Sequence, residues 1–338
     1  MSLDSQESIT GVGICASSLA NVFKSAGDSL RLDILKVLDK ASFGVQELAH
    51  IFAMAQPGMS HHLKVLAKAG LIVSRREGNS LFYRRPLIEE GSPIRTLLES
   101  LFASIDQIEL SPEILQRMSK VHQDRAAQSQ NFFKKNAEVF AEKQGRIVSF
   151  DQYSLAAEAL IKEVSGDASY WAVEVGPGKG ELLGVLAKKF EQVLALDNSP
   201  EMLKQSQLAA QRQNLKNVSF MEGDLEDLPE KDIGVDLLAL NMVLHHMPSP
   251  ADTFNTLKRV LKPGGVVFIA ELCLHDQEWV KDSCGDIWMG FRPDELDAWA
   301  MASGLQPRHS QYIGMKNGFQ VQLKTFFNID KVSNSFRV

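Results

Sequence analysis

The sequence predicts two domains: a smaller, mainly helical N-terminal domain and a larger C-terminal α/β domain with a mostly parallel, seven-stranded sheet. The chain has 338 residues, more than the ~250–300 residues at which a single hydrophobic core stops growing. Apolar residues recur at helical spacing over about residues 17–75, which indicates several short helices. After about residue 151 helical and strand-like patterns alternate, which is typical of βαβ units.

The N-terminal pattern is that of four helices followed by two strands. Pro57 opens the fourth helix and Gly70 ends it, because proline suits a first helical turn and glycine a helix end. The other helices are expected at Ser18–Lys24, Ser29–Leu38 and Val45–Phe52, and the strands at Leu71–Val73 and Ser80–Arg84, with a turn at Glu77–Asn79.

The C-terminal pattern ends in two strands separated by a short turn that contains glycine, which predicts an antiparallel hairpin at the end of the sheet. The expected strands are Trp171–Val175, Gln192–Leu196, Val218–Met221, Val235–Leu240, Val266–Leu272, Arg308–Ile313 and Phe319–Phe327. The helices between them include Gly180–Phe190 and Glu201–Arg212.

The predicted boundaries divide the chain into five parts. Residues 17–90 form the first domain and residues 151–327 the second. Residues 91–150 are expected to be a helical region that links them and serves as a dimer interface, a lid, or both. Residues 1–16 and 328–338 are expected to be tails.

Composition sets limits on where the protein works. The formal net charge is -6, which is not typical of a chain that binds nucleic acid over its whole surface, although a local basic patch is compatible with it. The cysteines are Cys15, Cys273 and Cys284. They form no Cys-x-x-Cys pair, so we expect a reducing, cytoplasmic environment. No signal-peptide pattern is present, and no apolar run approaches the ~18 residues of a membrane-spanning helix, so no membrane partner is expected.

The strand Trp171–Val175 leads directly into Gly176-Pro-Gly178-Lys-Gly180. Glycines are needed where the backbone turns sharply and a ligand approaches the chain closely, although a tight turn without a ligand has the same pattern. The spacing Gly-x-Gly-x-Gly differs from the Gly-x-Gly-x-x-Gly of dinucleotide sites. Asp197 ends the next strand, where a carboxylate can accept hydrogen bonds from both ribose hydroxyls. The alternative is an aspartate in a surface turn.

These residues resemble the class I methyltransferases, which use S-adenosylmethionine. Five segments are similar to motifs of that family, in the same order: Val173–Glu181, Leu196–Met202, Glu222–Leu225, Leu240–His246 and Leu261–Gly265. The resemblance extends from about Tyr153 to Phe327. It implies a Rossmann-like fold, S-adenosylmethionine as the cofactor and S-adenosylhomocysteine as the product.

The resemblance also implies roles for individual residues around the methionine and ribose parts of the cofactor. Glu174 and Gly176 line the methionine end, and Asn241 lies where the chain passes the methionine amino group. Asp197 holds the ribose, and Tyr153 caps the cofactor.

At the adenine end, Met202 packs near the base, Asp224 accepts a hydrogen bond from the adenine amine, and Leu225 offers its backbone. The whole implied cofactor-binding set is Tyr153, Glu174, Gly176, Gly178, Gly180, Asp197, Asn198, Met202, Gly223, Asp224, Leu225 and Asn241.

Methyl transfer from a sulfonium is an in-line displacement, so the protein mainly aligns the acceptor and excludes water. A base is needed only where the acceptor must lose a proton. His245 and His246 follow the fourth strand of the sheet, on the expected acceptor side, and are the candidate catalytic residues. Alternatively, one of them packs or caps and the other is exposed. No metal is expected.

The acceptor is expected to be a small molecule. Cys273–Phe291 is rich in Trp and Phe, so it forms either a pocket for an apolar or aromatic acceptor or an ordinary packed cover. Arsenite would need several thiolates, and this domain has only Cys273 and Cys284. The segment Asn-Met-Val-Leu after the fourth strand is not the motif of adenine methyltransferases, so DNA methylation is not expected.

Four helices followed by a two-stranded wing predict a winged helix-turn-helix. Residues 60–71 read Ser-x-His-Leu-x-x-Leu-x-x-Ala-Gly-Leu. Together with the wing Arg75–Tyr83 they resemble the ArsR family of bacterial repressors, over about residues 17–90. The resemblance implies a homodimer, formed through the first helix and a helix at Ile94–Ile105, that binds double-stranded operator DNA. Val45–Phe52 carries no Cys-x-Cys pair, so metal sensing is not expected.

Charge supports DNA binding locally. Between Ser60 and Arg85, six basic residues stand against one glutamate, a local charge of +5. Phosphate contacts need such a patch, although a basic face used for protein contacts has the same composition. The basic residues are Lys64, Lys68, Arg75, Arg76, Arg84 and Arg85. The expected DNA-binding residues are Ser60, His61, His62, Lys64, Arg75, Arg76, Asn79 and Tyr83.

Two functions fit this sequence. The first is a methyltransferase for a small molecule, fused to a DNA-binding regulator. The second is a repressor whose methyltransferase-fold domain senses S-adenosylmethionine or S-adenosylhomocysteine without significant turnover. A sensor would keep the same cofactor residues, so the sequence alone leaves both open. It also leaves open the acceptor, the operator and the direction of regulation.

Overall fold

A computed structural model describes residues 15–39, 41–77, 80–88, 91–165, 170–228, 234–277 and 279–330. The chain divides into two compact units, residues 1–121 and 122–338. The helical region expected over residues 91–150 is therefore shared between them. Within the described ranges, no helix is both long and apolar enough to cross a membrane.

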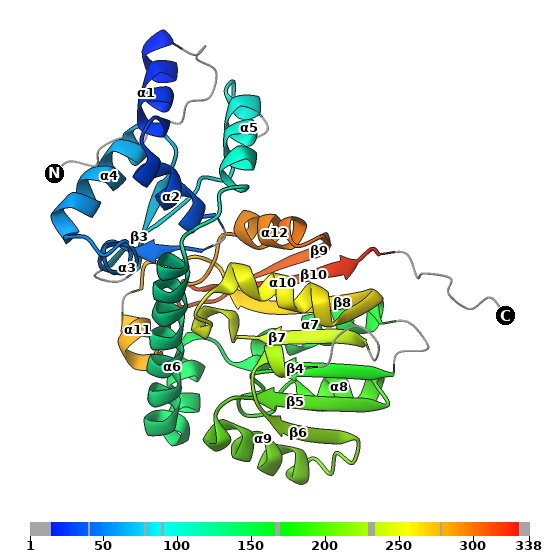
Figure 1. Ribbon diagram of the computed structural model, residues 1–338. Coiled ribbons are helices and arrows are strands. Elements are labelled where there is room, and N and C mark those ends of the chain that lie inside the picture. Colours follow the sequence, from blue (N-terminus) through cyan, green and yellow to red (C-terminus); the bar gives the residue numbers. More distant parts are fainter. Residues whose placement is uncertain are drawn as a thin grey trace. The chain divides into compact units, whose positions relative to one another are not determined.

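The first unit is mainly helical, with one small sheet. Its elements are α1 (Ala16–Ala26), α2 (Ser29–Val37), β1 (Phe43–Gly44), α3 (Val45–Ile51), α4 (Gln56–Lys68), β2 (Val73–Glu77), β3 (Ser80–Arg84), α5 (Arg95–Ile105) and the first part of α6 (Pro112–Ile147). The four predicted helices are all present (Figure 1). Pro57 lies in the first turn of α4, and Gly70 follows its end with a φ of +71°, a conformation that favours glycine.

The small sheet differs from the expected wing. Leu71 and Ile72 are buried in the core, and strand β2 begins only at Val73. The strand predicted at Leu71–Val73 is therefore wrong by two residues, because an apolar pair that closes a core has the same pattern as the start of a strand. The sheet also has a third strand, β1, which pairs with β3 in the order β1-β3-β2. Residues 78 and 79 of the expected turn lie outside the described residues.

Arg85 also differs from its expected role. It was counted in the basic patch, but its side chain is only 8% exposed. Its guanidinium donates to Leu35 O at 2.7 Å and pairs with Asp106 at 2.8 Å and with Asp39 at 3.4 Å. It also lies over the ring of Phe102, 4.7 Å from the centroid. Arg85 therefore joins α2, β3 and α5. A count of charges along the sequence does not reveal that this side chain points into the core.

The second unit is an α/β domain. Its elements begin with the rest of α6, followed by η1 (Phe150–Gln152), α7 (Ser154–Val164), β4 (Trp171–Val175), α8 (Leu183–Lys189), β5 (Gln192–Asp197), α9 (Pro200–Arg212), β6 (Val218–Glu222) and η2 (Leu225–Asp227). They continue with β7 (Val235–Asn241), η4 (Leu244–His246), α10 (Pro250–Val260), β8 (Leu261–Leu272), α11 (Trp279–Cys284), α12 (Pro293–Ala302), β9 (Leu305–Gly314) and β10 (Gln320–Asn328).

These strands form one seven-stranded sheet in the order β6-β5-β4-β7-β8-β10-β9. The first five pair in parallel, and β10 is antiparallel to both β8 and β9. The mostly parallel sheet and the final hairpin are thus confirmed. Helices cover both faces of the sheet (Figure 1), as its almost continuous apolar strands require.

Two boundaries in this unit were misplaced. The helix expected at Gly180–Phe190 begins only at Leu183, because the chain is still turning after the glycine loop. The segment Leu261–Gly265, expected to precede a strand, belongs to β8 itself, with an irregularity in its pairing to β7. Neither difference moves the carboxyl ends of β4, β5, β6 and β7, which lie at one edge because these strands are parallel.

The buried Arg85 gives a stability prediction. Arg85→Ala should lower the free energy of unfolding of the first unit by about 2–4 kcal/mol. This is less than the ~3–5 kcal/mol for breaking a fully buried pair, because the side chains of Asp39 and Asp106 are 28% and 33% exposed and solvent screens them. Hydrogen exchange of amides in α2 and β3 would measure it. Arg76→Ala, at an exposed position, is the control and should change stability by less than ~0.5 kcal/mol. Equal effects of the two substitutions would contradict the structural role of Arg85.

Candidate functional site

The glycine loop after β4 has backbone conformations that residues with a side chain rarely adopt. Gly176 and Gly178 have φ angles of +63° and +54°, in the left-handed region that favours glycine. A Cβ on Gly176 would lie 2.4 Å from Cγ2 of Val243, whereas a Cβ on Gly178 would meet nothing within 4 Å. Glycine is therefore required at position 176 because a side chain would collide with Val243. At position 178 it is required only by the backbone turn, which has open space beside it.

That open space belongs to a cavity of about 280 Å³ in the second unit. The glycine loop, the ends of β5, β6 and β7, and helix α6 all contribute to its wall. Ten of the twelve predicted cofactor residues line it: Tyr153, Gly176, Gly178, Asp197, Asn198, Met202, Gly223, Asp224, Leu225 and Asn241. The sequence therefore identified residues that the fold brings to one place, from segments up to 88 positions apart.

Gly180 and Glu174 are the two predicted residues that do not line the cavity. A Cβ on Gly180 would lie 3.3 Å from that of Ala209, so Gly180 lets the loop pack closely against α9. Glu174 is fully buried in β4, and neither of its carboxylate oxygens has a hydrogen-bond partner among the described residues. Burial, with the charges of Glu181 and Asp197, raises the pKa of Glu174 well above its usual range. Its predicted contact with the methionine end of the cofactor stays a prediction, because no part of Glu174 reaches the cavity wall.

Asp197 ends β5 and accepts a hydrogen bond from the backbone N–H of Ser199 at 2.9 Å. Burial raises the pKa of Asp197 to about 6; the bond from Ser199 opposes this rise, and the charge of Asp224 adds to it. Asn198 donates to Oδ1 of Asp224 at 2.7 Å and so joins the ends of β5 and β6. Two hydroxyl donors from a ribose would favour the ionised form of Asp197.

Tyr153 closes another side of the cavity. Its hydroxyl donates to Oδ1 of Asn241 at 2.8 Å, and the residue is only 3% exposed. This bond ties the start of α7 to the end of β7, so the predicted cap and the predicted methionine-side residue are held together. Burial raises the pKa of the Tyr153 phenol, so it remains a hydrogen-bond donor.

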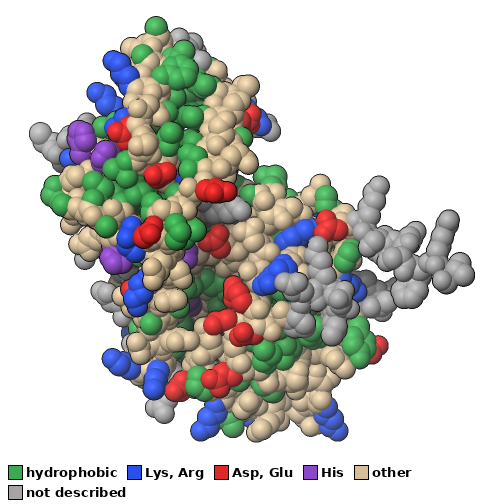
Figure 2. Space-filling model, viewed as in Figure 1, with side chains coloured by type: hydrophobic (Ala, Val, Ile, Leu, Met, Phe, Trp, Pro, Cys, Tyr) green, Lys and Arg blue, Asp and Glu red, His purple; other side chains and the backbone are tan. Residues whose placement is uncertain are grey.

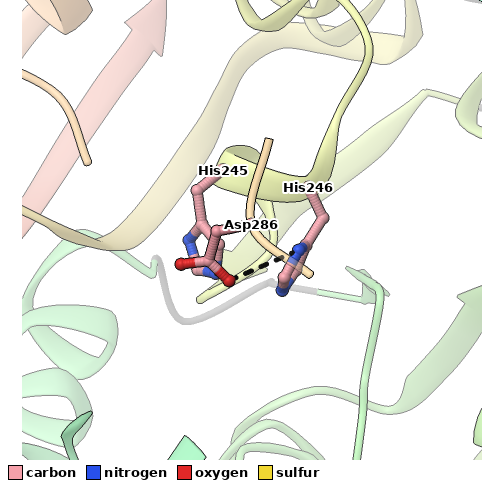
Figure 3. Close-up of side chains that lie close together, drawn as sticks. All are labelled: His245, His246 and Asp286. Atoms are coloured by element: carbon pink, nitrogen blue, oxygen red, sulfur yellow. Dashed lines mark ion pairs between the residues drawn. The ribbon is translucent and has the colours of Figure 1, made fainter. Parts of the chain in front are cut away.

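The two predicted catalytic histidines differ in their surroundings. His246 lines the cavity and His245 does not. Nδ1 of His245 lies 2.6 Å from Oε1 of Glu271 in β8, and the backbone N–H of His245 donates to Oε2 of the same carboxylate at 3.1 Å. Asp286 lies beside both imidazoles (Figure 3). The rings of His245 and His246 have centroids 4.1 Å apart.

Burial and charge set these histidines apart. Burial opposes protonation of His245, but the carboxylates of Glu271 and Asp286 outweigh it and raise the pKa of His245 to about 9. For His246, burial and the charge of His245 lower the pKa well below the usual value. The two adjacent imidazoles therefore do not share one protonation state.

Sequence reasoning did not identify Glu271 and Asp286 as site residues. Glu271 had a visible signal, because a carboxylate within the apolar run of β8 must find a buried partner. That partner is His245, 26 residues earlier in the chain. Asp286 had no comparable local signal, since it lies among mixed residues that follow α11.

The aromatic segment Cys273–Phe291 packs instead of lining the cavity. Trp288 is 3% exposed and donates through Nε1 to Met247 O at 2.8 Å. Phe291 is 1% exposed and lies 5.4 Å from the ring of Trp299. No described residue of the segment belongs to the cavity wall. Of the two alternatives for this segment, the packed cover is the one observed.

The predicted DNA-binding residues lie in α4 and in strands β2 and β3. His61, Lys64 and Arg76 are exposed, and Ser60, His62, Arg75 and Tyr83 are half-buried. Tyr83 packs against the core of the first unit, and Asn79 lies outside the described residues. Lys and Arg side chains are visible on the first unit in Figure 2. With Arg85 turned inward, the local charge available to phosphates is lower than the sequence count.

Family models match both parts of the chain. Residues 28–74 match a model described as bacterial regulatory protein, arsR family. Residues 173–269 match a model described as methyltransferase domain. The second match contains the glycine loop, Asp197, Asp224, Asn241 and both histidines.

Individual relatives match parts of the chain. An uncharacterized 37.1 kDa protein in transposon TN4556 of Streptomyces fradiae is 35% identical over 103 residues, which are 30% of this chain and 29% of that protein. A 2-methyl-6-phytyl-1,4-hydroquinone methyltransferase of Oryza sativa subsp. japonica is 32% identical over 147 residues, 43% of this chain and 41% of that protein. A ubiquinone biosynthesis O-methyltransferase of Acinetobacter baumannii is 28% identical over 114 residues, 33% of this chain and 48% of that protein.

The chain thus spans less than half the length of each of these relatives. Among solved structures, a 1,6-didemethyltoxoflavin-N1-methyltransferase of Burkholderia thailandensis is similar with 18% identity and a TM-score of 0.49, covering 66% of this chain and 93% of that one. One chain therefore carries a segment that matches a regulatory-protein model of the arsR family and a second segment that matches a methyltransferase-domain model.

Proposed function

We propose that the protein transfers a methyl group from S-adenosylmethionine to a small-molecule acceptor, and that its N-terminal domain binds operator DNA as a homodimer. The observation that carries the first part is the single cavity that gathers ten predicted cofactor residues and has His246 on its wall. The relatives named as methyltransferases of ubiquinone biosynthesis and of a hydroquinone support a small-molecule acceptor.

The acceptor enters on the side of His246. Besides this imidazole, that part of the wall carries Phe133, Met247, Pro248 and Thr253, a mainly apolar set. Within the proposal, an apolar wall excludes water and leaves alignment of the acceptor to few polar groups. His246 is the candidate for contact with the reacting atom, and His245 holds a position next to it through Glu271.

A second function, sensing of the cofactor or its demethylated product, is favoured by two observations. The cavity volume of about 280 Å³ is just below the ~300–1,000 Å³ of small-molecule sites, so a cofactor would fill most of it. Helix α6 supplies Val121 to the core of the first unit and Ala126 and Ser129 to the cavity wall of the second. A ligand that reorders α6 would therefore act on a helix that the regulatory domain uses.

The cofactor site has a pH test. Binding of S-adenosylhomocysteine should weaken as the pH falls through about 6, the pKa of Asp197 in the free protein. The ribose hydroxyls donate to the ionised carboxylate, so affinity is full above this pKa and declines by up to ~10-fold per pH unit below it. Calorimetric titration between pH 8 and pH 5 would measure it.

The matched control is Asp197→Asn, which should bind more weakly at pH 8 and lose most of the pH dependence. Asp197→Ala should cost about 1–3 kcal/mol, the scale of leaving polar partners unpaired. If wild-type protein bound neither cofactor form, the proposed function would be wrong, and only the methyltransferase fold would remain.

A turnover assay distinguishes a catalytic methyltransferase from a protein that only senses the cofactor. With methyl-labelled cofactor and candidate acceptors, the wild type should give labelled product, and His246→Gln should lower the rate by ~10²-fold or more if the acceptor must lose a proton. Affinity for S-adenosylhomocysteine should change less than ~3-fold, because alignment of the cofactor does not need His246. His309→Gln, a half-buried histidine of β9, is the control. An unchanged rate in His246→Gln would remove this residue from the reaction.

For the sensing function, the expected result is a change in affinity for operator DNA when one cofactor form is added, because a ligand shifts an equilibrium only through different affinities for two states. The α6 segment near Phe133 should also become less sensitive to protease. If neither S-adenosylmethionine nor S-adenosylhomocysteine changes the DNA affinity or the protease sensitivity of the free protein, the sensing function is excluded and the enzyme function remains.

A further inference from the structure

Four ionisable side chains are buried together beside the cofactor cavity. His245 and His246 come from η4, Glu271 from β8 and Asp286 from the segment after α11, and their residues are 4%, 6%, 0% and 2% exposed. Burial of ionisable groups is costly unless their charges are compensated. Three of these groups converge on one point: ligand atoms of His245, His246 and Asp286 all lie within 4.8 Å of one another (Figure 3).

The two imidazoles of this cluster lie beyond hydrogen-bonding distance of Asp286 but close enough to share an ion with it. Nε2 of His245 lies 3.8 Å from Oδ1 of Asp286, and Nδ1 of His246 lies 3.8 Å from the same oxygen. Hydrogen bonds between nitrogen and oxygen are about 2.7–3.2 Å long. Ligand atoms each about 2.0–2.2 Å from one ion in tetrahedral geometry are separated by about 3.3–3.6 Å. The two nitrogen–oxygen separations exceed this range by about 0.2–0.5 Å, and the three ligand atoms lie within 4.8 Å of one another.

His245 is held in the orientation that a metal ligand requires. Its Nδ1 lies 2.6 Å from Oε1 of Glu271, so Nε2 is the nitrogen that faces Asp286. Glu271 is itself fixed, because its carboxylate accepts backbone N–H groups from His245 at 3.1 Å and Leu272 at 2.6 Å. An imidazole that binds a metal through one nitrogen and a carboxylate through the other is the usual arrangement in protein metal sites.

Charge and space fit the same ligand. Glu271 and Asp286 bring two carboxylates into the interior, and one divalent cation compensates both, with release of the proton from the His245 nitrogen that it binds. A cavity of about 10 Å³ adjoins the cluster and is lined by His245, His246 and Asp286 among others. This is about the space of one small ion or one water molecule.

We propose that His245 Nε2, His246 Nδ1 and Asp286 bind one divalent transition-metal ion, with Glu271 as the carboxylate that orients His245. Two imidazoles and one carboxylate suit Zn²⁺, Co²⁺ or Fe²⁺, whereas Mg²⁺ and Ca²⁺ take oxygen ligands. Three protein ligands leave a further coordination position for water or for an oxygen or nitrogen atom of a small molecule. Because His246 also lines the main cavity, the ion stands at the boundary between the two spaces.

Metal binding by the full-length protein tests the proposal without any assay of methyl transfer. Protein stripped with a chelator should bind one Co²⁺ per chain with visible absorption bands of four- or five-coordinate cobalt, and one Zn²⁺ should displace it. Asp286→Asn should weaken Zn²⁺ binding at least ~100-fold, and Glu271→Gln about 10–100-fold, the usual effect of losing the partner of a ligating imidazole. His309→Gln should bind as the wild type does.

Absence of stoichiometric Co²⁺ and Zn²⁺ binding by the wild type would overturn the proposal, and so would equal affinity in Asp286→Asn and wild type. Calorimetric binding of S-adenosylhomocysteine shows whether each variant is folded, and the wild-type titration decides the question even where a variant is not. Metal ligation and proton acceptance by Nδ1 of His246 exclude each other, because the nitrogen has one lone pair. If the wild type binds no ion and His246→Gln loses turnover, the proposed metal site is rejected and the role of His246 as a base is retained.

Discussion

The constraint on which the second unit depends is that strands in parallel pairing end at the same edge of the sheet. Strand β4 lies between β5 and β7, so the sheet grows to one side through β5 and β6 and to the other through β7 and β8. The loops that leave β4, β5, β6 and β7 therefore meet at that edge, where the cavity lies. The glycine loop, Asp197, Asp224 and Asn241 share one cavity because of this pairing, not because they are close in sequence.

Close packing at this edge requires backbone conformations that are rare for residues other than glycine. Gly176 lies against Val243 without room for a Cβ, and Met242, just before that valine, has a φ of +53°. A non-glycine residue in this region is strained, and here the N–H of Met242 is held by Ala270 O at 2.8 Å. The same residue lines the cavity. Strain held in place by sheet hydrogen bonds is often found at ligand sites, and it explains how two loops approach each other so closely.

The sequence predicted much of this fold because its signals are local. The alternation of strand-like and helical patterns identified all seven strands of the large sheet, and the glycine loop with Asp197 identified the cofactor cavity. Three features escaped because they depend on direction or on distant partners. Arg85 has the charge of a phosphate ligand but points into the core. Glu271 meets His245 across 26 residues. The first strand of the small sheet is two residues long and exists only through its pairing with β3.

Helix α6 contributes residues to both units. Val121 belongs to the core of the first unit, and Ala126 and Ser129 belong to the cavity wall of the second. One residue rotates an α-helix by about 100°. An insertion of one residue between Val121 and Ala126 would therefore turn one face of α6 away from its partners, whereas an insertion of seven would return both faces almost to phase. The length of this stretch of helix is thus constrained to changes that keep both faces in phase.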